Sequence, residues 1–169
     1  MNIILEKARN EDIDDIVYLV NTAYRGEQGW TTEADLIAGD RTNTNEVTDF
    51  LNNPNMHLLV VYNRGEILAC VCVENARDKA LIGYFAVDPK FQNMGIGQSV
   101  LSHAENYALT VLHKNRINLL IISARSELKS YYLRHGYKVT GLSKDFPNNP
   151  ALGSPTKPLS LEFLSKILK

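Results

Sequence analysis

Apolar and polar positions recur along this chain with two different periods. Between residues 10 and 25, apolar side chains return every three or four positions, which is the period of one helix face. The same period predicts helices at 45–53, from about 97 to 113, and at 126–135. Short apolar runs bounded by turn residues predict strands. The expected strands cover residues 2–8, 57–62, 66–73, 79–87, 117–122, 137–141 and 159–164.

The order of these elements is β-α-α-β-β-β-α-β-α-β-β, which predicts a mixed α/β sheet with helices on its faces. The sequence "NRG" between the second and third strands marks a hairpin. Residues 26–47 are a polar connector dotted with aromatic and charged side chains, and we expect a loop with short helical pieces there. A chain of 169 residues is expected to form one domain, residues 1–169.

Composition narrows the class of protein. The chain is 44% hydrophobic and 22% charged, as in ordinary globular proteins, and its net charge of −1 gives no global field for nucleic acid or an anionic membrane. No apolar run is long enough to span a bilayer. Cys70 and Cys72 point to the same face of a strand and are interpreted as reduced, packed thiols. We therefore expect a cytoplasmic protein with no nucleic-acid or membrane partner and no metal site.

One short stretch carries candidate chemistry. "FQNMGIGQSV", residues 91–100, joins an expected strand to the start of an expected helix. Unpaired N–H groups at a helix start favour an anion, and glycines let the main chain approach a phosphate closely. The pattern lacks the lysine of a P-loop and the third glycine of a dinucleotide fingerprint. From the loop alone, a plain strand-to-helix turn and a phosphate site remain equally open.

A second motif, "SYYLRHGYKVTG" at residues 130–141, favours the phosphate site. Together with "VDPKFQNMGIG", it resembles the motifs of the GCN5-related N-acetyltransferase (GNAT) superfamily. That superfamily has Gln/Arg-x-x-Gly-x-Gly/Ala after a strand ending in V-x-P, and an aromatic-Tyr pair shortly before Gly-Phe/Tyr. The matching residues are Val87, Pro89, Gln92, Gly95, Gly97, Tyr131, Tyr132, Gly136 and Tyr137. The connector resembles an uncharacterised branch of the superfamily, which names no substrate.

The resemblance implies a GNAT-type fold, a mostly antiparallel mixed sheet with helices on both faces, and acetyl-CoA as co-substrate. The main chain of Phe85, Ala86 and Val87 would pair with the pantetheine arm like an added strand. The loop formed by Gln92, Asn93, Met94, Gly95, Ile96 and Gly97 would hold the pyrophosphate, with Gln98 in the first helical turn. The implied activity is transfer of an acetyl group to a primary amine of a small molecule or peptide by direct attack.

The catalytic residues follow in part from the same resemblance. Tyr132 is the predicted donor to the leaving thiolate, with a core aromatic residue as the alternative interpretation. Many relatives carry a carboxylate in the central strand, but "LIGYFAV" has none, so Glu74 is the predicted base; a solvated strand-end charge is its alternative. Arg125 stands where many relatives have Asn, which leaves its coenzyme A contact open, although it could reach a phosphate.

The resemblance also implies that the acceptor site is built largely from the loop after the first helix, here residues 21–42, and from the strands that face it. Tyr24 and Trp30 would wall a pocket, and Glu33 would meet a cationic amine. The structural alternative is that Trp30 anchors the loop and Glu33 caps a helix. Two functional hypotheses stay open: an N-acetyltransferase, and a non-catalytic module that senses acyl-CoA or binds a partner. By analogy with relatives, a homodimer is a further expectation.

Overall fold

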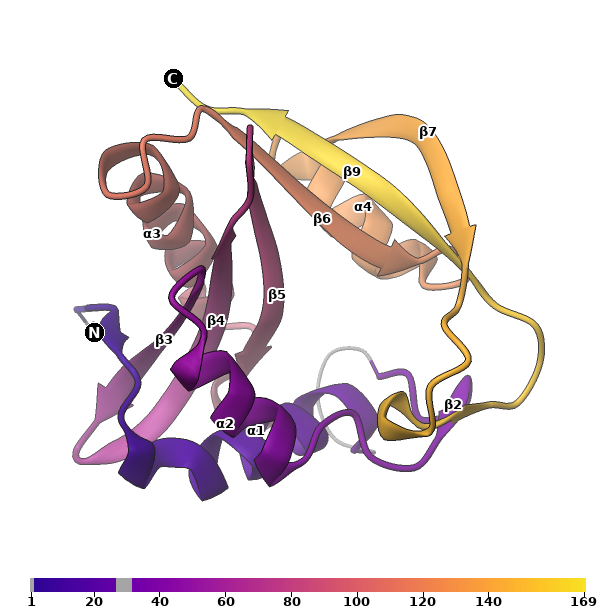
Figure 1. Ribbon diagram of the computed structural model, residues 1–169, viewed down its shortest axis with the longest axis horizontal. Helices are drawn as coiled ribbons and strands as arrows, with labels where there is room; N and C mark the ends of the chain where they lie inside the picture. The colour runs from indigo at the N-terminus through magenta and orange to yellow at the C-terminus, as the bar shows by residue number, and fades with distance from the viewer. Residues whose placement is uncertain (1, 27–31) are drawn as a thin grey trace.

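A seven-stranded sheet organises residues 2–26 and 32–169, which are the residues described by the computed structural model (Figure 1). Its strand order is β1-β3-β4-β5-β6-β9-β7, and every neighbouring pair is antiparallel except β5 and β6. The strands are β1 Glu6–Lys7, β3 Met56–Asn63, β4 Glu66–Asn75, β5 Ala80–Val87, β6 Arg116–Ile122, β7 Lys138–Asp145 and β9 Ser160–Ile167. The predicted mixed, mostly antiparallel sheet is confirmed.

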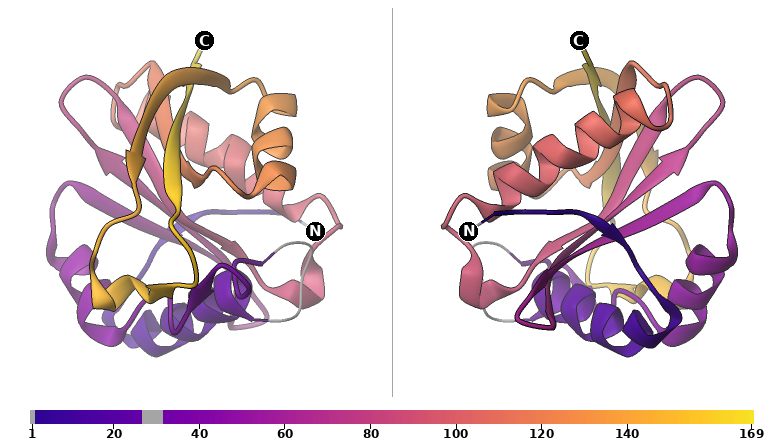
Figure 2. Two further views of the ribbon diagram at one scale, coloured as in Figure 1. Left: turned by 90° about the vertical axis from the view of Figure 1, so that its right-hand side faces the viewer. Right: turned by 90° about the vertical axis from the view of Figure 1, so that its left-hand side faces the viewer.

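Helices cover both faces of this sheet (Figure 2). Helices α1 (Ile13–Arg25) and α2 (Thr44–Asn52) pack on one face, and α3 (Ile96–Thr110) and α4 (Ser126–Arg134) pack on the other. Each helix turns one apolar stripe to the sheet, so two separate layers of core form. Among the described residues, no helix has the length and apolar character needed to cross a membrane.

Strands β5 and β6 pair over only a short distance and then separate. Their parallel register joins Ala80–Ile82 to Ile117–Leu119 and goes no further. Figure 1 shows the consequence: β3, β4 and β5 form one arm, β6, β9 and β7 form another, and the arms meet at one end. The second half of β5 therefore has a main-chain edge that β6 does not occupy.

A bulge lies where β5 leaves β6. Cys70 of β4 pairs with Ala86, but Cys72 pairs with Gly83, so β5 carries an extra residue in this stretch. Tyr84, inside the bulge, has a left-handed φ of 49° although it is not glycine. Its ring is buried and its hydroxyl hydrogen-bonds with Thr42, which holds the side chain in place. The bulge bends β5 and adds twist at the point of separation.

The connector and the chain end differ from the expectation. Two short strands, β2 (Ile37–Ala38) and β8 (Ser154–Pro155), form a small antiparallel sheet that the sequence pattern did not predict. Strands of two residues have no detectable period, and their pairing joins segments that are distant along the chain. This small sheet fixes the connector against the segment before β9.

The two cysteines give a simple test of the core. Cys70 and Cys72 are free and buried, and burial is the main cause that raises the pKa of both to about 12. At about pH 8, only about one such thiol in 10⁴ is the reactive thiolate. We expect iodoacetamide to leave both unmodified in the native protein and to label both in guanidinium chloride, as counted by mass spectrometry. Rapid labelling of either thiol in the native protein would contradict this placement.

Candidate functional site

An elongated cavity of about 340 Å³ opens between the separated strands and the start of α3. It lies along the free edge of β5, beside the loop of residues 88–95 and the facing side of α4. Its lining residues are Ala23, Tyr24, Phe85, Ala86, Val87, Gln92, Asn93, Gly95, Gly97, Gln98, Arg125, Leu128, Tyr131, Tyr132, Arg134 and His135. We call it the donor cavity, because it contains residues that the resemblance predicts to bind the acetyl donor. All but two of the eleven residues predicted to bind coenzyme A line it.

The exceptions are Met94 and Ile96. The Met94 side chain is 64% exposed to solvent, and Ile96 is buried in the core under α3. Neither side chain lines the donor cavity, so any role of these two residues would rest on their main chain. The sequence pattern singled out neither Arg134 nor His135, which is the C-cap residue of α4, yet both lie on the cavity wall.

The loop before α3 is shaped by backbone constraints. Gln92 folds back, and its Nε2 donates a hydrogen bond of 3.1 Å to the carbonyl oxygen of Val87. Asn93 and Gly95 have φ angles of 62° and 77°, and a residue with a side chain adopts that region at a cost. Helix α3 then begins at Ile96, and its first N–H groups have no partner inside the helix.

Gly97 leaves space at the mouth of this helix. A Cβ built there would lie 3.6 Å from the Tyr131 hydroxyl and 3.8 Å from Val87, which is ordinary contact. The fold itself therefore tolerates a side chain at this position, which would project into the donor cavity. The exposed N–H groups and the missing side chain together make a cradle that fits a pyrophosphate.

A second cavity, of about 250 Å³, lies between the diverging ends of β5 and β6. We call it the acceptor cavity, because Tyr24 and Glu33, which were predicted to bind the acceptor, line it. Apolar side chains of β6 form one wall, and Phe146 and Pro147, which follow β7, lie on its border. Five residues line both cavities and so mark their junction: Tyr24, Phe85, Arg125, Leu128 and Tyr132.

Tyr132 is the buried aromatic residue at this junction. Its side chain lies edge-on to the rings of Tyr131 and Tyr137, so packing fixes its orientation. Burial raises the pKa of its hydroxyl well above the usual value of a tyrosine, and the neighbouring Tyr24 and Tyr131 add to this. The hydroxyl keeps its proton and can donate it to a ligand in a hydrogen bond.

The structure does not bring Glu74 to either cavity. Glu74 is the second-last residue of β4 and lies opposite Leu81 and Met56, at the closed end where β5 still pairs with β6. Its partner Leu81 lies five residues before Ala86 on β5, and Glu74 lines neither cavity. This geometry gives no support to its predicted role as a base. Trp30, the other predicted acceptor residue besides Tyr24 and Glu33, falls outside the described residues.

Glu33 lies in the acceptor cavity, but two arginines already bind its carboxylate. Arg25 Nε donates a hydrogen bond of 2.6 Å to Glu33 Oε1, and Arg125 Nη1 donates one of 3.2 Å to Oε2. All three side chains are 5–7% exposed. The expected contact between Glu33 and a substrate ammonium would have to compete with both arginines. The contact of Arg125 with Glu33 likewise turns at least one of its amino groups away from a phosphate.

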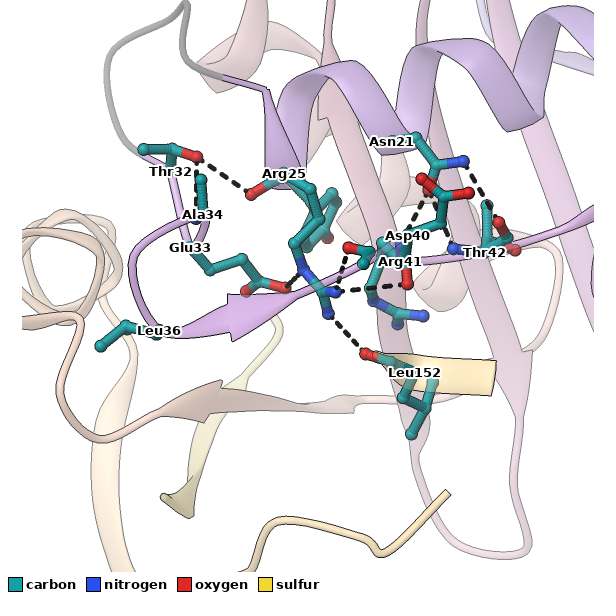
Figure 3. Close-up of polar contacts among 12 residues, drawn as sticks. Asn21, Arg25, Thr32, Glu33, Ala34, Leu36, Asp40, Arg41, Thr42 and Leu152 are labelled. Atoms are coloured by element: carbon teal, nitrogen blue, oxygen red, sulfur yellow. Dashed lines mark hydrogen bonds and ion pairs between the residues drawn. The ribbon is translucent and has the colours of Figure 1, made fainter. Parts of the chain in front are cut away.

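Arg25 also fixes the connector to the end of the chain. Its two terminal nitrogens donate to the carbonyl oxygens of Gly39, Asp40 and Leu152, at 2.8 to 3.2 Å (Figure 3). One hydrogen-bonded cluster thus joins α1, the connector, the loop before α4 and the segment before β9. We call Arg25, Glu33 and Arg125 the ionic cluster. It forms the floor of the acceptor cavity.

Two further lining residues were not predicted. Tyr84 sits within an apolar strand, where nothing in the pattern distinguishes it from a core residue. Arg41 is one of the charged side chains of the connector, and its guanidinium lies 4.9 Å from the ring centre of Tyr84 and 5.5 Å from that of Tyr24. The signal that could have found Arg41 is the concentration of charged and aromatic side chains in residues 26–47.

Removing the charge of Glu33 should destabilise the protein strongly. The substitution Glu33→Gln leaves two buried arginines without their carboxylate, and we expect a loss of about 3–5 kcal/mol in the free energy of unfolding. Urea denaturation followed by circular dichroism measures this loss. The exposed Glu66→Gln in the β3–β4 hairpin makes the same chemical change as a control and should have almost no effect. A loss below about 1 kcal/mol for Glu33→Gln would show that the ionic cluster is not structural.

A comparison of the chain with known proteins identifies its family. A family model described as "Acetyltransferase (GNAT) domain" matches residues 54–139, which is just over half of the chain. A search of curated proteins gives no match.

Solved structures share the fold over nearly the whole chain. An N-acetyltransferase from Staphylococcus aureus Mu50 superposes with a TM-score of 0.75 at 18% identity, over 99% of this chain and 98% of that one. The PaiA N-acetyltransferase of Thermoplasma acidophilum, in complex with coenzyme A, gives 0.73 at 16% identity, over 99% of both. The yncA protein of Salmonella typhimurium, with its cofactor acetyl-CoA, gives 0.70 at 18%, over 100% and 95%. The family motifs, the separated central strands and the match to the family model agree, and the chain belongs to the GNAT acetyltransferase family.

Proposed function

We propose that residues 1–169 form a single acetyltransferase domain that transfers an acetyl group from acetyl-CoA to a primary amine of a small molecule or peptide by direct attack. The observation that carries this proposal is the meeting of two cavities at Tyr132. Direct attack requires both substrates to be bound at once with their reacting atoms in contact. Two cavities with a shared wall of five residues satisfy that requirement.

The donor cavity fits acetyl-CoA in shape and in chemistry. The free edge of β5 from Gly83 to Val87 offers main-chain groups to the amides of a pantetheine arm, as an added strand would. The cradle at Gly97 suits the pyrophosphate. Coenzyme A and acetyl-CoA in the PaiA and yncA structures, which share this fold, support the assignment. With the pyrophosphate at the cradle and the arm along β5, the thioester would lie near Tyr132.

Tyr132 would act as a hydrogen-bond donor to the sulfur. A thiol leaving group has a pKa of about 8.5 by analogy with cysteine. Because burial raises the pKa of Tyr132 above its ordinary value, complete proton transfer from this hydroxyl to the thiolate is unfavourable. The hydroxyl instead stabilises the negative charge that develops on sulfur as the carbon–sulfur bond breaks. Tyr132 therefore stays neutral through the reaction and needs no reprotonation between turnovers.

The acceptor must reach the junction as a neutral amine. Its nitrogen lone pair forms the new carbon–nitrogen bond, the carbon–sulfur bond breaks, and the electron pair leaves on the coenzyme A sulfur. The proton lost by the nitrogen passes to solvent. A primary ammonium has a pKa near 10.4, so the site needs either a base or an environment that lowers this value.

A second candidate function keeps support from one observation. Among the described lining residues of both cavities, Glu33 is the one carboxylate, and it is bound by two arginines. A non-catalytic module that senses acyl-CoA would have such a site. Calorimetry with acetyl-CoA, combined with a thiol-release assay over a panel of amines, separates the two candidates. Release of coenzyme A that depends on the amine supports the enzyme, and binding without release over the panel supports the module.

Filling the cradle should weaken donor binding. In Gly97→Val the new side chain would enter the donor cavity where the helix N–H groups point, and we expect acetyl-CoA affinity to fall at least about tenfold. Calorimetry measures the affinity, and thermal unfolding monitors the fold. Ser102→Val, at an exposed position of the same helix, is the matched control. Equal affinity of both variants for acetyl-CoA would show that the loop does not take part in binding the donor.

Removing the Tyr132 hydroxyl should slow turnover without affecting donor binding. We expect Tyr132→Phe to lower kcat by about 10²–10³, the usual effect of losing one donor to a developing charge, with acetyl-CoA affinity within about twofold. A thiol-release assay and calorimetry give the two values. Tyr18→Phe, on the exposed face of α1, controls for the general effect of losing a phenol. Unchanged kcat in Tyr132→Phe would exclude the residue from the mechanism.

A further inference from the structure

The acceptor cavity has a surplus of positive charge. Among the described residues that line it, the charged ones are Arg25, Arg41, Arg125, Lys144 and Glu33. Glu33 is bound within the ionic cluster, so in the described lining one carboxylate faces four cations. The carboxylate of Glu46, which is not part of the lining, lies 4.0 Å from Arg41. The rest of the wall is largely apolar, and its low polarity strengthens the field of these charges. An amine that enters as an ammonium is repelled here, whereas an anionic group is attracted.

Arg41 is the cation of this cavity that is prepared for a ligand. Its guanidinium is held by cation–π contacts with Tyr24 and Tyr84. In the described part of the chain its side chain makes no hydrogen bond, and its buried Nη1, which faces Glu46 across an ion pair, has no hydrogen-bond partner. Its one ion pair, with Glu46, spans 4.0 Å, while Thr42 donates a hydrogen bond of 2.8 Å to the same carboxylate.

This situation contrasts with that of Arg25. Arg25 donates four hydrogen bonds to Glu33 and to three carbonyl oxygens, so its nitrogens are committed to the fold. In Figure 3, Arg25 has dashed lines to its neighbours, whereas the labelled Arg41 side chain has none. A planar guanidinium with unused donors matches a carboxylate in a bidentate arrangement. The rings of Tyr24 and Tyr84 fix its orientation in advance, which lowers the entropy lost on binding.

We infer that the acceptor is a small amine that carries its own carboxylate, and that Arg41 binds this carboxylate. The inference rests on the proposed function, because it names the substrate class of the same acceptor site. The volume of about 250 Å³ is below the roughly 300–1,000 Å³ typical of sites for drug-sized ligands, so it suits a molecule of amino-acid size. The wall formed by Ile82, Leu119 and Ile121 takes an apolar side chain. An amino acid with an apolar side chain has all three properties.

The same charges would also prepare the amine for attack. After the substrate carboxylate has paired with Arg41, Arg25, Arg125 and Lys144 still outweigh Glu33. Nearby positive charge disfavours the ammonium form and lowers its pKa, so a larger fraction of the bound amine is neutral. This effect supplies the nucleophile in a site whose described walls hold no free carboxylate.

A matched set of three amines tests the inference. Phenylalanine, phenylalaninamide and phenethylamine share one ring and one amine but differ in the carboxylate; leucine and its two counterparts form a second set. Thiol release is measured with acetyl-CoA, and kcat/KM is compared per neutral amine because the three amines differ in pKa. We expect the acid to exceed the amide by about 10- to 100-fold, as for a charge-assisted bidentate pair. An amide or simple amine that equals the acid would overturn the inference.

Variants assign the effect to Arg41. Arg41→Met should remove the preference by lowering kcat/KM for the acid, while the value for the simple amine should not fall and should rise if repulsion by Arg41 limits its entry. Arg41→Lys should keep part of the preference. Arg77→Met makes the same charge change at an exposed turn and should preserve the preference. Acetyl-CoA affinity and thermal unfolding show whether each variant is folded. An equal loss for all three amines in Arg41→Met would overturn the role of Arg41.

Binding measurements keep the test decisive when turnover is low. Calorimetry of each acid and amide is repeated with coenzyme A present, so that both cavities are formed. Failure of every acid in both sets to bind or react would overturn the inference, whether or not acetyl-CoA binds. Failure of acetyl-CoA itself to bind would instead overturn the proposed function, so the two failures are distinguishable.

Discussion

The separation of β5 from β6 after three paired residues is the constraint on which the rest of the molecule depends. A central parallel pair that continued to the end of β5 would bury its main chain and leave no slot for a ligand. The bulge at Tyr84 bends β5 away, and the hydrogen bond of Tyr84 to Thr42 anchors the bend in the helical layer. Both cavities lie in the space that this separation opens, and Tyr132 of α4 reaches their junction.

An open slot between two arms needs a brace, and the ionic cluster provides one. Arg25 comes from the layer beneath β5, Arg125 follows β6, and Glu33 in the connector bonds to both. Burying three charges has a high desolvation cost, which the paired geometry and the hydrogen bonds of Arg25 to main-chain carbonyl oxygens offset. The brace therefore fixes the width of the acceptor cavity with polar contacts and leaves the apolar wall of β6 uncovered.

The sequence predicted the parts of this arrangement that are encoded locally. The apolar periods located the helices and the long strands. The glycine spacing around Gly95 and Gly97 located the loop before α3, because a left-handed turn before a helix depends on the residue types at a few adjacent positions. The partners of Glu33 lie 8 and 92 residues away from it along the chain, in other elements, so no local sequence pattern indicated its ion pairs. Glu74 was selected as the nearest strand-end carboxylate, but the β4–β5 register sets it opposite Leu81, away from the cavities. Two-residue strands such as β2 are too short to show a period.

The charges of the acceptor cavity connect substrate choice to reactivity. A site that attracts ammonium ions through a carboxylate binds the unreactive form of the amine, and must then remove a proton. A site with surplus cations excludes simple ammonium ions, and a substrate carboxylate restores the attraction. Under the proposal made above, Arg41 would make the carboxylate a condition for entry, while Arg25 and Arg125 would keep the remaining field positive at the nitrogen. In this arrangement, the same set of charges would bind the carboxylate of the acceptor and favour the neutral form of its amine. The lack of a carboxylate on β5 would then be consistent with catalysis.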